Sequence, residues 1–260
     1  MSSFLEKIVA IKLKEIEALS ERKLEVPKGG TLRANFRKAL EEGRGKRGIG
    51  LICEYKRASP SLGDIELKLT PEEAAAAYAK SDCLSVLTER EFFKGDISYL
   101  SRMGPLPLLR KDFIIHPLQV VETIMTKASA VLIMLSLPLD DHELIGLKEL
   151  ARKFGILPVV EVSNEEELKR ARHLGSELIQ VNARNFKTME VDIHNNLKLI
   201  EKYPPRGGEF FISASGVKGG KDLKNLKDAG YGAALIGTSL MKGGEPEKKL
   251  ERILEELEAC

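Results

Sequence analysis

The sequence predicts an α/β fold, a TIM (β/α)8 barrel with an N-terminal helical extension, and three observations support this class. Eight short apolar strands alternate with eight helical patterns, at intervals of very roughly 25 residues. Several strands end in charged or hydroxyl side chains, as expected where an active site lies at the carboxyl ends of parallel strands. The 260 residues suffice for one large domain or two small ones. We expect a single domain over residues 1–260, with the extension over 1–48 and the barrel over 49–260.

The composition limits the class of partner. The chain has 41 basic and 39 acidic residues, a net charge of +2, and 43% hydrophobic residues that can supply a full core. A balanced surface gives no reason to expect nucleic acid or an anionic membrane as partner. The sequence contains no run of about 18 apolar residues, the length needed to span a bilayer. Its N-terminus is charged early and lacks the apolar core of a signal peptide. We therefore expect a cytoplasmic protein that binds a small molecule, as a monomer or, alternatively, a weak homodimer.

The cysteines and histidines give no metal or disulfide pattern. The cysteines are odd in number and scattered, at Cys53, Cys83 and Cys260. They predict reduced structural thiols, because neither a disulfide framework nor a zinc-ligand spacing is present. The histidines are equally dispersed, at His116, His142, His173 and His194. They match neither a helical metal motif nor a nucleophile triad.

The N-terminal extension is predicted to contain two helices. Apolar residues at helical spacing predict an amphipathic helix from Phe4 to about Arg22. Residues 27–30, Pro-Lys-Gly-Gly, break this helix, and residues 32–42 predict a second one. Since both helices precede the first strand, we expect the extension to cover part of the barrel.

Residues 43–48 match the glycine fingerprint of dinucleotide-binding folds, but the context is wrong. That motif needs a strand before it and a helix after it, whereas here a helix precedes and a strand follows. We predict a flexible linker, with ligand contact by its basic residues as a minor alternative. The alternative fold, a doubly wound open sheet, usually has fewer strands and a glycine-rich first turn, which this chain lacks.

The barrel elements follow from apolar runs and turn signals. The predicted strands are residues 50–56, 83–88, 106–111, 130–135, 157–162, 178–182, 210–213 and 233–236. The predicted helices are residues 71–80, 97–103, 117–127, 140–154, 165–174, 195–203, 221–229 and 245–258. Asn164 and Glu167 form a variant capping box at a helix start, and Gly155, Gly175 and Gly230 stand where helices are expected to end.

The stretch from Ile52 to Ser61 passes abruptly from apolar to charged residues. In a strand, Glu54 and Lys56 lie on the same face, and residues 59–61 are turn formers that end the strand. For any single strand, running out into solvent is the more probable interpretation. However, later strands also end in polar residues, among them Lys111, Glu161 and Asn182.

These strand ends bring two lysines, two glutamates, an asparagine and an arginine to one mouth. The residues are Glu54, Lys56, Lys111, Glu161, Asn182 and Arg184. Each alone is more often a solvated strand end or part of a structural ion pair. Together they predict a polar site above an apolar barrel, where burial and neighbouring charges can tune lysine and glutamate for proton transfer.

The last two strands are followed by loops rich in glycine and hydroxyl groups. Ser215 and Gly216 follow the seventh strand, and Gly237 and Thr238 follow the eighth. Glycine lets backbone N–H groups approach an anion, and barrels often hold a phosphate at these two loops. Tight turns alone are the alternative, but the hydroxyl groups favour a phosphate site.

Several segments, taken in order through all eight strands, resemble the indole-3-glycerol-phosphate synthase family. They are residues 54–61, 87–89, 109–115, 160–162, 181–185, 190–192, 213–216 and 235–241, and the helical extension is also similar. The runs Glu-Tyr-Lys-Arg-Ala-Ser-Pro-Ser at 54–61 and Lys-Asp-Phe-Ile at 111–114 are the most specific. Many other barrels share the phosphate loops.

The resemblance implies a cofactor-free carboxy-lyase of tryptophan biosynthesis. Its substrate, 1-(2-carboxyphenylamino)-1-deoxyribulose 5-phosphate, undergoes ring closure, decarboxylation and dehydration. By this resemblance Lys111 is the general acid, Glu161 handles the proton of the dehydration step, and Lys56 pairs with an anionic end of the substrate and is a second proton donor. Glu54 and Asn182 orient these groups. The implied substrate-binding residues are Ser59, Phe93, Phe113, Leu132, Arg184, Ser215, Gly216, Gly237 and Thr238.

One position departs from the family pattern. The family typically has Ser-Glu-Ser-Gly after the seventh strand, where this chain has Ala214 in place of the glutamate. This loss of a carboxylate leaves three interpretations: natural variation, a redesigned or impaired phosphate-binding barrel, and drift towards another substrate. A Schiff-base aldolase using Lys111 or Lys56 is a further alternative.

Overall fold

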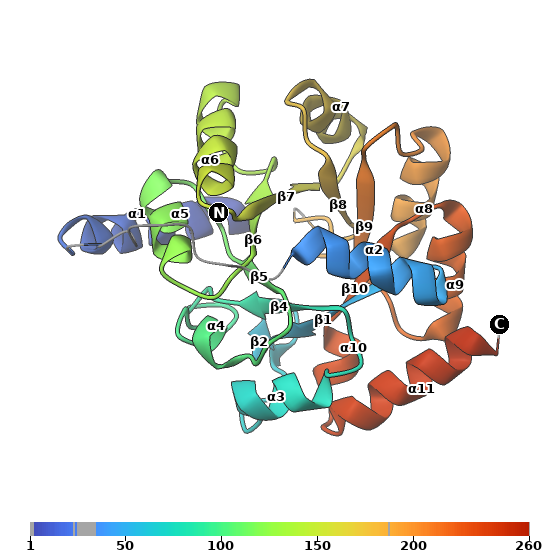
Figure 1. Ribbon diagram of the computed structural model, residues 1–260. Coiled ribbons are helices and arrows are strands. Elements are labelled where there is room, and N and C mark those ends of the chain that lie inside the picture. Colours follow the sequence, from blue (N-terminus) through green and yellow to red (C-terminus); the bar gives the residue numbers. More distant parts are fainter. Residues whose placement is uncertain (1–2, 23, 25–34, 187, 260) are drawn as a thin grey trace.

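The computed structural model describes residues 3–22, 24, 35–186 and 188–259. Within these ranges eight parallel strands close into a barrel in the order β1-β10-β9-β8-β7-β6-β5-β4 (Figure 1). The barrel strands are β1 (Gly50–Tyr55), β4 (Cys83–Leu87), β5 (Leu108–Lys111), β6 (Ala130–Met134), β7 (Leu157–Val162), β8 (Leu178–Asn182), β9 (Phe210–Ala214) and β10 (Ala233–Ile236). The predicted barrel is confirmed, and closure excludes an open sheet.

Helices cover the barrel. They are α1 (Phe4–Ser20), α2 (Phe36–Arg47), α3 (Pro71–Ala77), α4 (Tyr99–Arg102), α5 (Pro117–Ile124), α6 (Asp141–Lys153), α7 (Glu165–His173), α8 (Ile193–Lys202), α9 (Gly220–Ala229), α10 (Thr238–Met241) and α11 (Pro246–Glu258). Most predicted helices are found with ends shifted by a few residues. No helix in the described part of the chain is long and apolar enough to cross a membrane.

The predicted helix boundaries have a clear backbone basis. Gly155, Gly175 and Gly230 all have positive φ, which lets the chain leave each helix without a Cβ clash. Asn164 accepts a hydrogen bond from the backbone N–H of Glu167 and caps α7, as predicted. The Glu167 carboxylate, however, accepts from the backbone and hydroxyl of Ser163. The cap is therefore confirmed, but its reciprocal bond is to the preceding residue.

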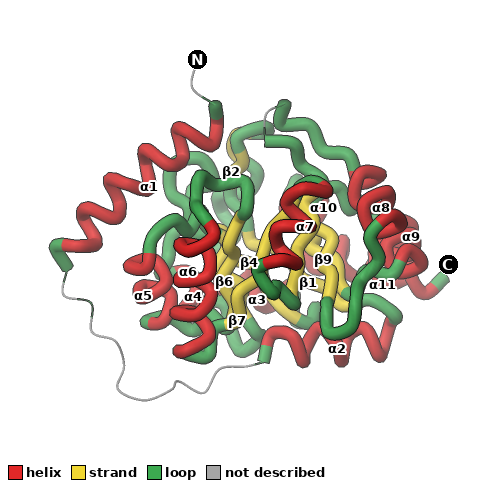
Figure 2. The backbone as a smooth tube through the Cα atoms, turned by 90° about the horizontal axis from the view of Figure 1, so that it is seen from above, coloured by secondary structure: helices red, strands yellow, loops and turns green. Residues whose placement is uncertain are grey.

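The two helices of the extension lie at opposite ends of the barrel (Figure 2). Helix α2 covers the amino ends of the strands, where the backbone of Leu40 approaches Gly50 so closely that a Cβ at this glycine would clash. Helix α1 lies at the carboxyl ends and contacts α5. The break predicted at residues 27–30 and the predicted helix start at residue 32 lie outside the described residues.

The prediction of a flexible linker over residues 43–48 was wrong. Helix α2 continues through Gly43 and Gly45 to Arg47, and Gly48 (φ 82°) ends it. Gly43 is buried where a Cβ would collide with the Asp82 carboxylate, and Arg47 pairs with the same carboxylate. This packing outweighs the roughly 1 kcal/mol that a helical glycine costs. The basic residues of this segment therefore lie far from the mouth of the barrel.

Two short elements were not predicted. The chain after β1 forms an antiparallel pair, β2 (Ala58–Ser59) and β3 (Gly63–Asp64), where only a turn was expected. Helix α10 begins directly after β10, so Thr238 is its first residue. Both elements are at the carboxyl ends of the strands and bear on the pocket described below.

One buried lysine outside the mouth gives a prediction about pH. Lys148 on α6 is 3% exposed and donates hydrogen bonds to the Leu174 carbonyl and, at 3.1 Å, to the Ser176 hydroxyl. Burial lowers the pKa of Lys148 to about 8. Between about pH 8 and the ordinary lysine pKa near 10.5, Lys148 carries a proton in the unfolded chain but has largely lost it in the folded protein. Folding stability contributed by this residue therefore rises with pH.

We expect the free energy of unfolding of the wild type, relative to Lys148→Met, to increase by at most ~1.4 kcal/mol per pH unit across this window. Urea unfolding of both proteins at pH 7, 8, 9 and 10 measures the difference. Parallel pH dependences for the two proteins would contradict the prediction.

Candidate active site

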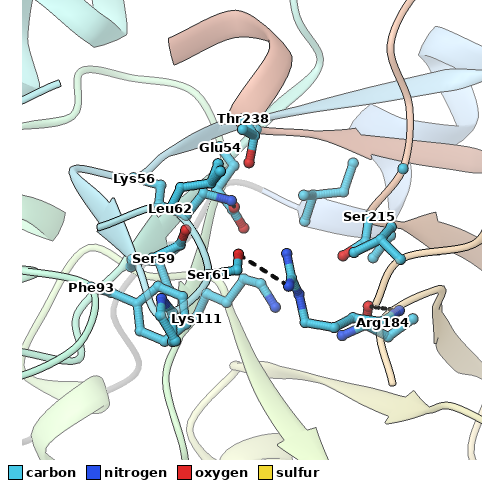
Figure 3. A pocket seen from close by; sticks show the side chains of 18 of the residues that line it. Glu54, Lys56, Ser59, Ser61, Leu62, Phe93, Lys111, Arg184, Ser215 and Thr238 are labelled. Carbon is cyan, nitrogen blue, oxygen red and sulfur yellow. Dashed lines mark hydrogen bonds and ion pairs between the residues drawn. The ribbon is translucent and has the colours of Figure 1, made fainter. Parts of the chain in front are cut away.

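A cavity of about 640 Å³ opens at the carboxyl ends of the barrel strands (Figure 3). Every residue that the sequence analysis assigned to catalysis or binding lines it. They are Glu54, Lys56, Ser59, Phe93, Lys111, Phe113, Leu132, Glu161, Asn182, Arg184, Ser215, Gly216, Gly237 and Thr238. The barrel topology thus brings the predicted residues together, while their individual roles remain predictions.

Strand β1 supplies an ion pair at the floor of the pocket. The Lys56 ammonium lies 3.0 Å from the Glu54 carboxylate, as the alternation of a strand predicted. The Ser85 hydroxyl donates to the other Glu54 oxygen at 3.3 Å. Burial opposes ionisation of Glu54, but Lys56 and Lys111 hold its pKa below the usual range. Glu54 is therefore an ionised group that contacts Lys56 and is stabilised by the charge of Lys111.

Strands β5 and β7 supply a second lysine and glutamate. The Lys111 ammonium lies 3.5 Å from Oε2 of Glu161, whose side chain is 2% exposed. The Asn182 amide donates to Oε1 of the same carboxylate at 3.0 Å. A lysine amino group and a glutamate carboxyl group therefore lie side by side at the floor of the pocket.

Arg184 extends from the loop after β8 towards the hairpin after β1. Its guanidinium donates to the Ser61 hydroxyl at 3.3 Å and to the Met189 carbonyl at 3.0 Å (Figure 3). Its backbone N–H donates to Asn182 Oδ1 at 3.0 Å, which fixes the asparagine. Burial lowers the pKa of Arg184, and Glu54 and Glu161 oppose that effect. The guanidinium thus remains a cation at one wall of the pocket.

The loops after β9 and β10 form the wall next to Arg184. Ser215 (φ 68°) and Gly216 (φ 87°) are consecutive residues with positive φ, a conformation that can turn successive N–H groups towards an anion. The Ser239 hydroxyl donates to the Val217 carbonyl at 2.9 Å and joins the two loops. A Cβ at Gly237 would lie 2.6 Å from the Glu54 carboxylate, so glycine is required there. In Figure 3 this wall, with Ser215 and Thr238, faces Phe93 and Lys111.

The pocket favours an anionic ligand. Its lining includes the cations Lys56, Lys111, Arg184, Lys218 and Lys242, against the carboxylates Glu54, Asp112 and Glu161. The Ser59 hydroxyl is buried and has no hydrogen-bond partner among the described residues. Because an unpaired buried hydroxyl is costly, Ser59 is suited to donate to a ligand.

Four phenylalanines form the apolar wall, and two of them were missed. Phe113 lies 6.2 Å from Phe93 and 6.1 Å from Phe4, and Phe4 stacks on Phe186 at 6.3 Å between ring centroids. Phe4 belongs to α1 and Phe186 to the loop after β8. The extension was expected to cover something, but the sequence contained no signal that Phe4 enters the pocket.

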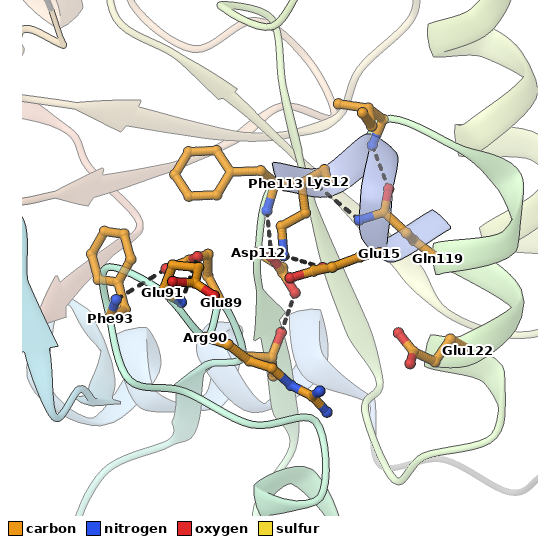
Figure 4. A network of polar contacts seen from close by, with 12 residues as sticks. Lys12, Glu15, Glu89, Arg90, Glu91, Phe93, Asp112, Phe113, Gln119 and Glu122 are labelled. Atoms are coloured by element: carbon orange, nitrogen blue, oxygen red, sulfur yellow. Dashed lines mark hydrogen bonds and ion pairs between the residues drawn. The ribbon is translucent and has the colours of Figure 1, made fainter. Parts of the chain in front are cut away.

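A buried ionic network joins helix α1 to the strand that carries Lys111 (Figure 4). The Lys12 ammonium is fully buried and lies 2.7 Å from Asp112, the residue after Lys111. Asp112 also accepts from the Thr88 hydroxyl at 2.5 Å, from Arg110 at 3.1 Å and from the Phe113 N–H at 2.8 Å. Burial opposes ionisation of Asp112, but Lys12 and Arg110 hold its pKa well below the usual range.

The end of β4 has a structural role. The Glu89 carboxylate is fully buried and accepts from the backbone N–H groups of residues 91–93. It thereby fixes the loop that carries Phe93 (Figure 4). Neither Glu89 nor Thr88 is among the described residues that line the pocket. These two side chains therefore do not belong to the group of polar residues that meet at the mouth of the barrel.

The amino-acid sequence is similar to that of one protein family over nearly its whole length. A family model described as indole-3-glycerol phosphate synthase matches residues 5–253. An indole-3-glycerol phosphate synthase of Lachnospira eligens is 41% identical over 217 residues, 81% of this chain and 81% of that protein. Proteins of the same name from Acetivibrio thermocellus and Polaromonas naphthalenivorans are 42% identical over 207 residues and 36% identical over 266 residues. The alignment with the Acetivibrio protein covers 78% of both chains. The alignment with the Polaromonas protein covers 98% of this chain and 100% of the relative.

Solved structures resemble the chain more distantly. A 3-hexulose-6-phosphate synthase aligns with a TM-score of 0.62 at 17% identity, over 81% of this chain and 99% of that chain. A tryptophan synthase subunit alpha from Legionella pneumophila strain Paris aligns with a TM-score of 0.60 at 10% identity, over 86% and 98%. At these identities the likeness supports the barrel fold alone.

Proposed function

The chain belongs to the indole-3-glycerol phosphate synthase family, and from this premise we propose roles for the residues of the pocket. The reaction closes the pyrrole ring of 1-(2-carboxyphenylamino)-1-deoxyribulose 5-phosphate and releases carbon dioxide and water, as a step of tryptophan biosynthesis. It needs an acid at the ketone oxygen, a base for the final proton, and a remote grip on the phosphate that holds the reacting carbons close.

Lys111 is proposed as the general acid and Glu161 as the base. Ring closure joins the ring carbon that bears the carboxylate to the ketone carbon, and Lys111 protonates the ketone oxygen. Departure of carbon dioxide restores the aromatic ring. The new hydroxyl then leaves as water with a second proton, and Glu161 removes the proton from the adjacent carbon. The 3.5 Å separation of these two groups carries the proposal.

The other residues are proposed to orient the substrate. Lys56 pairs with the carboxylate that leaves as carbon dioxide and is a second proton donor, while Glu54 and Asn182 orient the acid and the base. Apolar contact with the aromatic ring comes from Phe93, Phe113 and Leu132, which line one side of the pocket. The phosphate is bound by Ser59, Ser215, Gly216, Gly237 and Thr238, and Arg184 binds substrate oxygens beside the hairpin.

Replacement of Glu161 by glutamine tests this assignment. The amide keeps the size of the side chain but cannot take a proton, so kcat is expected to fall by about 10²–10⁴-fold. Turnover is measured from the indole fluorescence of the product, and substrate binding by calorimetry. A kcat within threefold of the wild type would remove Glu161 from the mechanism.

Position 214 gives a second test. Ala214 ends β9 next to Asn182 and lines the pocket, at the position where the resemblance implies a carboxylate. Ala214→Glu is expected to raise kcat several-fold, because the added charge faces a pocket rich in cations. Ala214→Gln is the uncharged control of equal size. An unchanged or lower kcat/KM in the glutamate variant would show that this chain has dispensed with the carboxylate.

The chain is further proposed to act as a cytoplasmic monomer with a single domain over residues 1–260. All the residues to which roles are assigned above belong to one chain, so the proposed reaction requires no residue of a second copy. The one ligand class that follows from the family is a phosphorylated small molecule.

A further inference from the structure

Gln180 is a fully buried polar residue below the floor of the pocket, and the roles proposed above do not include it. It lies on β8 two residues before Asn182, so both side chains point to the same face of the strand. The register of the barrel pairs Gln180 directly with Glu161 on β7. Gln180 is therefore held beside the proposed base without being one of the described residues that line the pocket.

The Gln180 amide makes one short contact, to the base. Its nitrogen donates to Oε2 of Glu161 at 2.5 Å. Because an ionised carboxylate only accepts, this orientation of the amide is chemically required. Its own oxygen, Oε1, finds no hydrogen-bond partner within the described ranges. A buried unpaired acceptor costs about 1–3 kcal/mol, so packing alone gives a poor account of a glutamine here.

Both oxygens of Glu161 are thus satisfied by neutral donors. Asn182 donates to Oε1 at 3.0 Å and Gln180 to Oε2, the oxygen that Lys111 approaches only to 3.5 Å. A buried carboxylate without such donors draws the nearest cation into a tight ion pair. Here the amide of Gln180 occupies the oxygen that Lys111 would otherwise bind closely.

We infer that Gln180 is a positioning residue that fixes the Glu161 carboxylate and keeps Lys111 from closing onto it, so that the acid and the base remain available as separate groups. The inference rests on the proposed roles of Lys111 and Glu161. It extends them by naming the neutral side chain that keeps the two apart.

Besides this amide, Glu161 is faced by groups from several elements. Lys111 reaches it from β5, and the Arg184 guanidinium is attracted to it and to Glu54. Lys56 is paired with Glu54 on β1, and the β6 residue opposite Glu161 is Met134, which carries no charge. Loss of the Gln180 donor therefore leaves Lys111 as the cation nearest to the vacated oxygen.

The experiment compares Gln180→Leu and Gln180→Met with the wild type in full pH profiles of kcat and KM. In both variants kcat is expected to fall by about 10- to 100-fold, as for a small displacement of a catalytic group, while KM changes less than threefold. The alkaline limb of the kcat profile is expected to move to higher pH, because Lys111 then holds its proton against Glu161 more tightly. Gln180→Glu, which sets a second carboxylate beside Glu161, is expected to move the acidic limb to higher pH.

Ser213→Ala is the matched control. Ser213 is equally buried on the neighbouring strand β9 and accepts a hydrogen bond from Asn196, away from Glu161. It is expected to lower stability without altering either limb. The inference is overturned if both Gln180 variants behave like Ser213→Ala, or if kcat falls with no movement of the limbs. Should one variant not fold, the other decides.

Failure of the proposed function is distinguishable from failure of this inference. If Glu161→Gln retains kcat, the assignment of the base is wrong and the inference falls with it. If Glu161→Gln loses activity while folded Gln180→Leu and Gln180→Met retain it, only the positioning role is overturned.

Discussion

Replacement of Lys111 by methionine is expected to lower kcat by about 10²–10⁴-fold, the range for loss of a general acid. Lys111 is the lysine at the end of β5 that lies within 3.5 Å of Glu161. Methionine retains much of the volume but removes the charge and the proton. The large effect follows because ring closure and dehydration both need a proton delivered to the same oxygen.

The assay follows indole fluorescence at saturating substrate, with circular dichroism to confirm folding. Lys46→Met is the control, since Lys46 is exposed on α2 at the opposite end of the barrel. Its kcat should equal that of the wild type. Retention of more than a third of wild-type kcat by Lys111→Met would transfer the role of acid to another group, with Lys56 next to be tested.

Replacement of Lys12 by methionine is expected to destabilise the fold by about 3 kcal/mol, the lower part of the range for breaking a buried ion pair. Lys12 and Asp112 are both almost inaccessible to solvent and lie 2.7 Å apart. The variant leaves the Asp112 carboxylate buried with one counter-charge fewer. Arg110 and Thr88 still contact Asp112, so the loss should not reach the upper part of the range.

Urea unfolding of Lys12→Met, Asp112→Asn and the double variant measures this effect as a double-mutant cycle. The double variant should be more stable than the sum of the single losses predicts, because the orphaned charge is gone. Lys14→Met, on an exposed position of α1, is the control. A loss below 1 kcal/mol for Lys12→Met would mean that the pair contributes little to holding α1.

The Lys12→Met variant is expected to lower kcat/KM as well as stability. Helix α1 carries Phe4, which lies against Phe113, and Lys12 of the same helix pairs with Asp112, the residue that follows Lys111. Loosening the helix therefore affects the apolar wall and the acid together. Activity measured well below the unfolding midpoint separates this local effect from global unfolding.

Much of the barrel was predictable because its signals are local. Each strand is a short apolar run, and the alternation of a strand was enough to predict that Glu54 and Lys56 face the same way. Glycines with positive φ ended helices at the predicted positions, such as Gly155 and Gly175. Eight such units indicate a barrel, and active sites of barrels lie at the carboxyl ends of the strands, so the polar residues at these ends were predicted to lie close together.

Local sequence patterns gave wrong or missing predictions where tertiary packing determines the structure. The glycine motif at residues 43–48, with a helix before it and a strand after it, predicts a linker, yet Gly43 is the residue that lets α2 approach Asp82. The β2–β3 pair was missed because each strand has two residues, too few for a periodic pattern. Gln180 could have been noticed from alternation, since it shares a face with Asn182, but only its contact with Glu161 gives it a role.

The class of fold, the order of its elements and the set of polar residues at the strand ends were predictable from the sequence, because all three depend on spacing along the chain. Contacts between side chains were not predictable in this way, and the structure alone shows that Lys12 touches Asp112, Gln180 touches Glu161 and Phe4 touches Phe113. Such pairs join segments distant in sequence. Their distances depend on barrel closure and register, and no local pattern of residues encodes either.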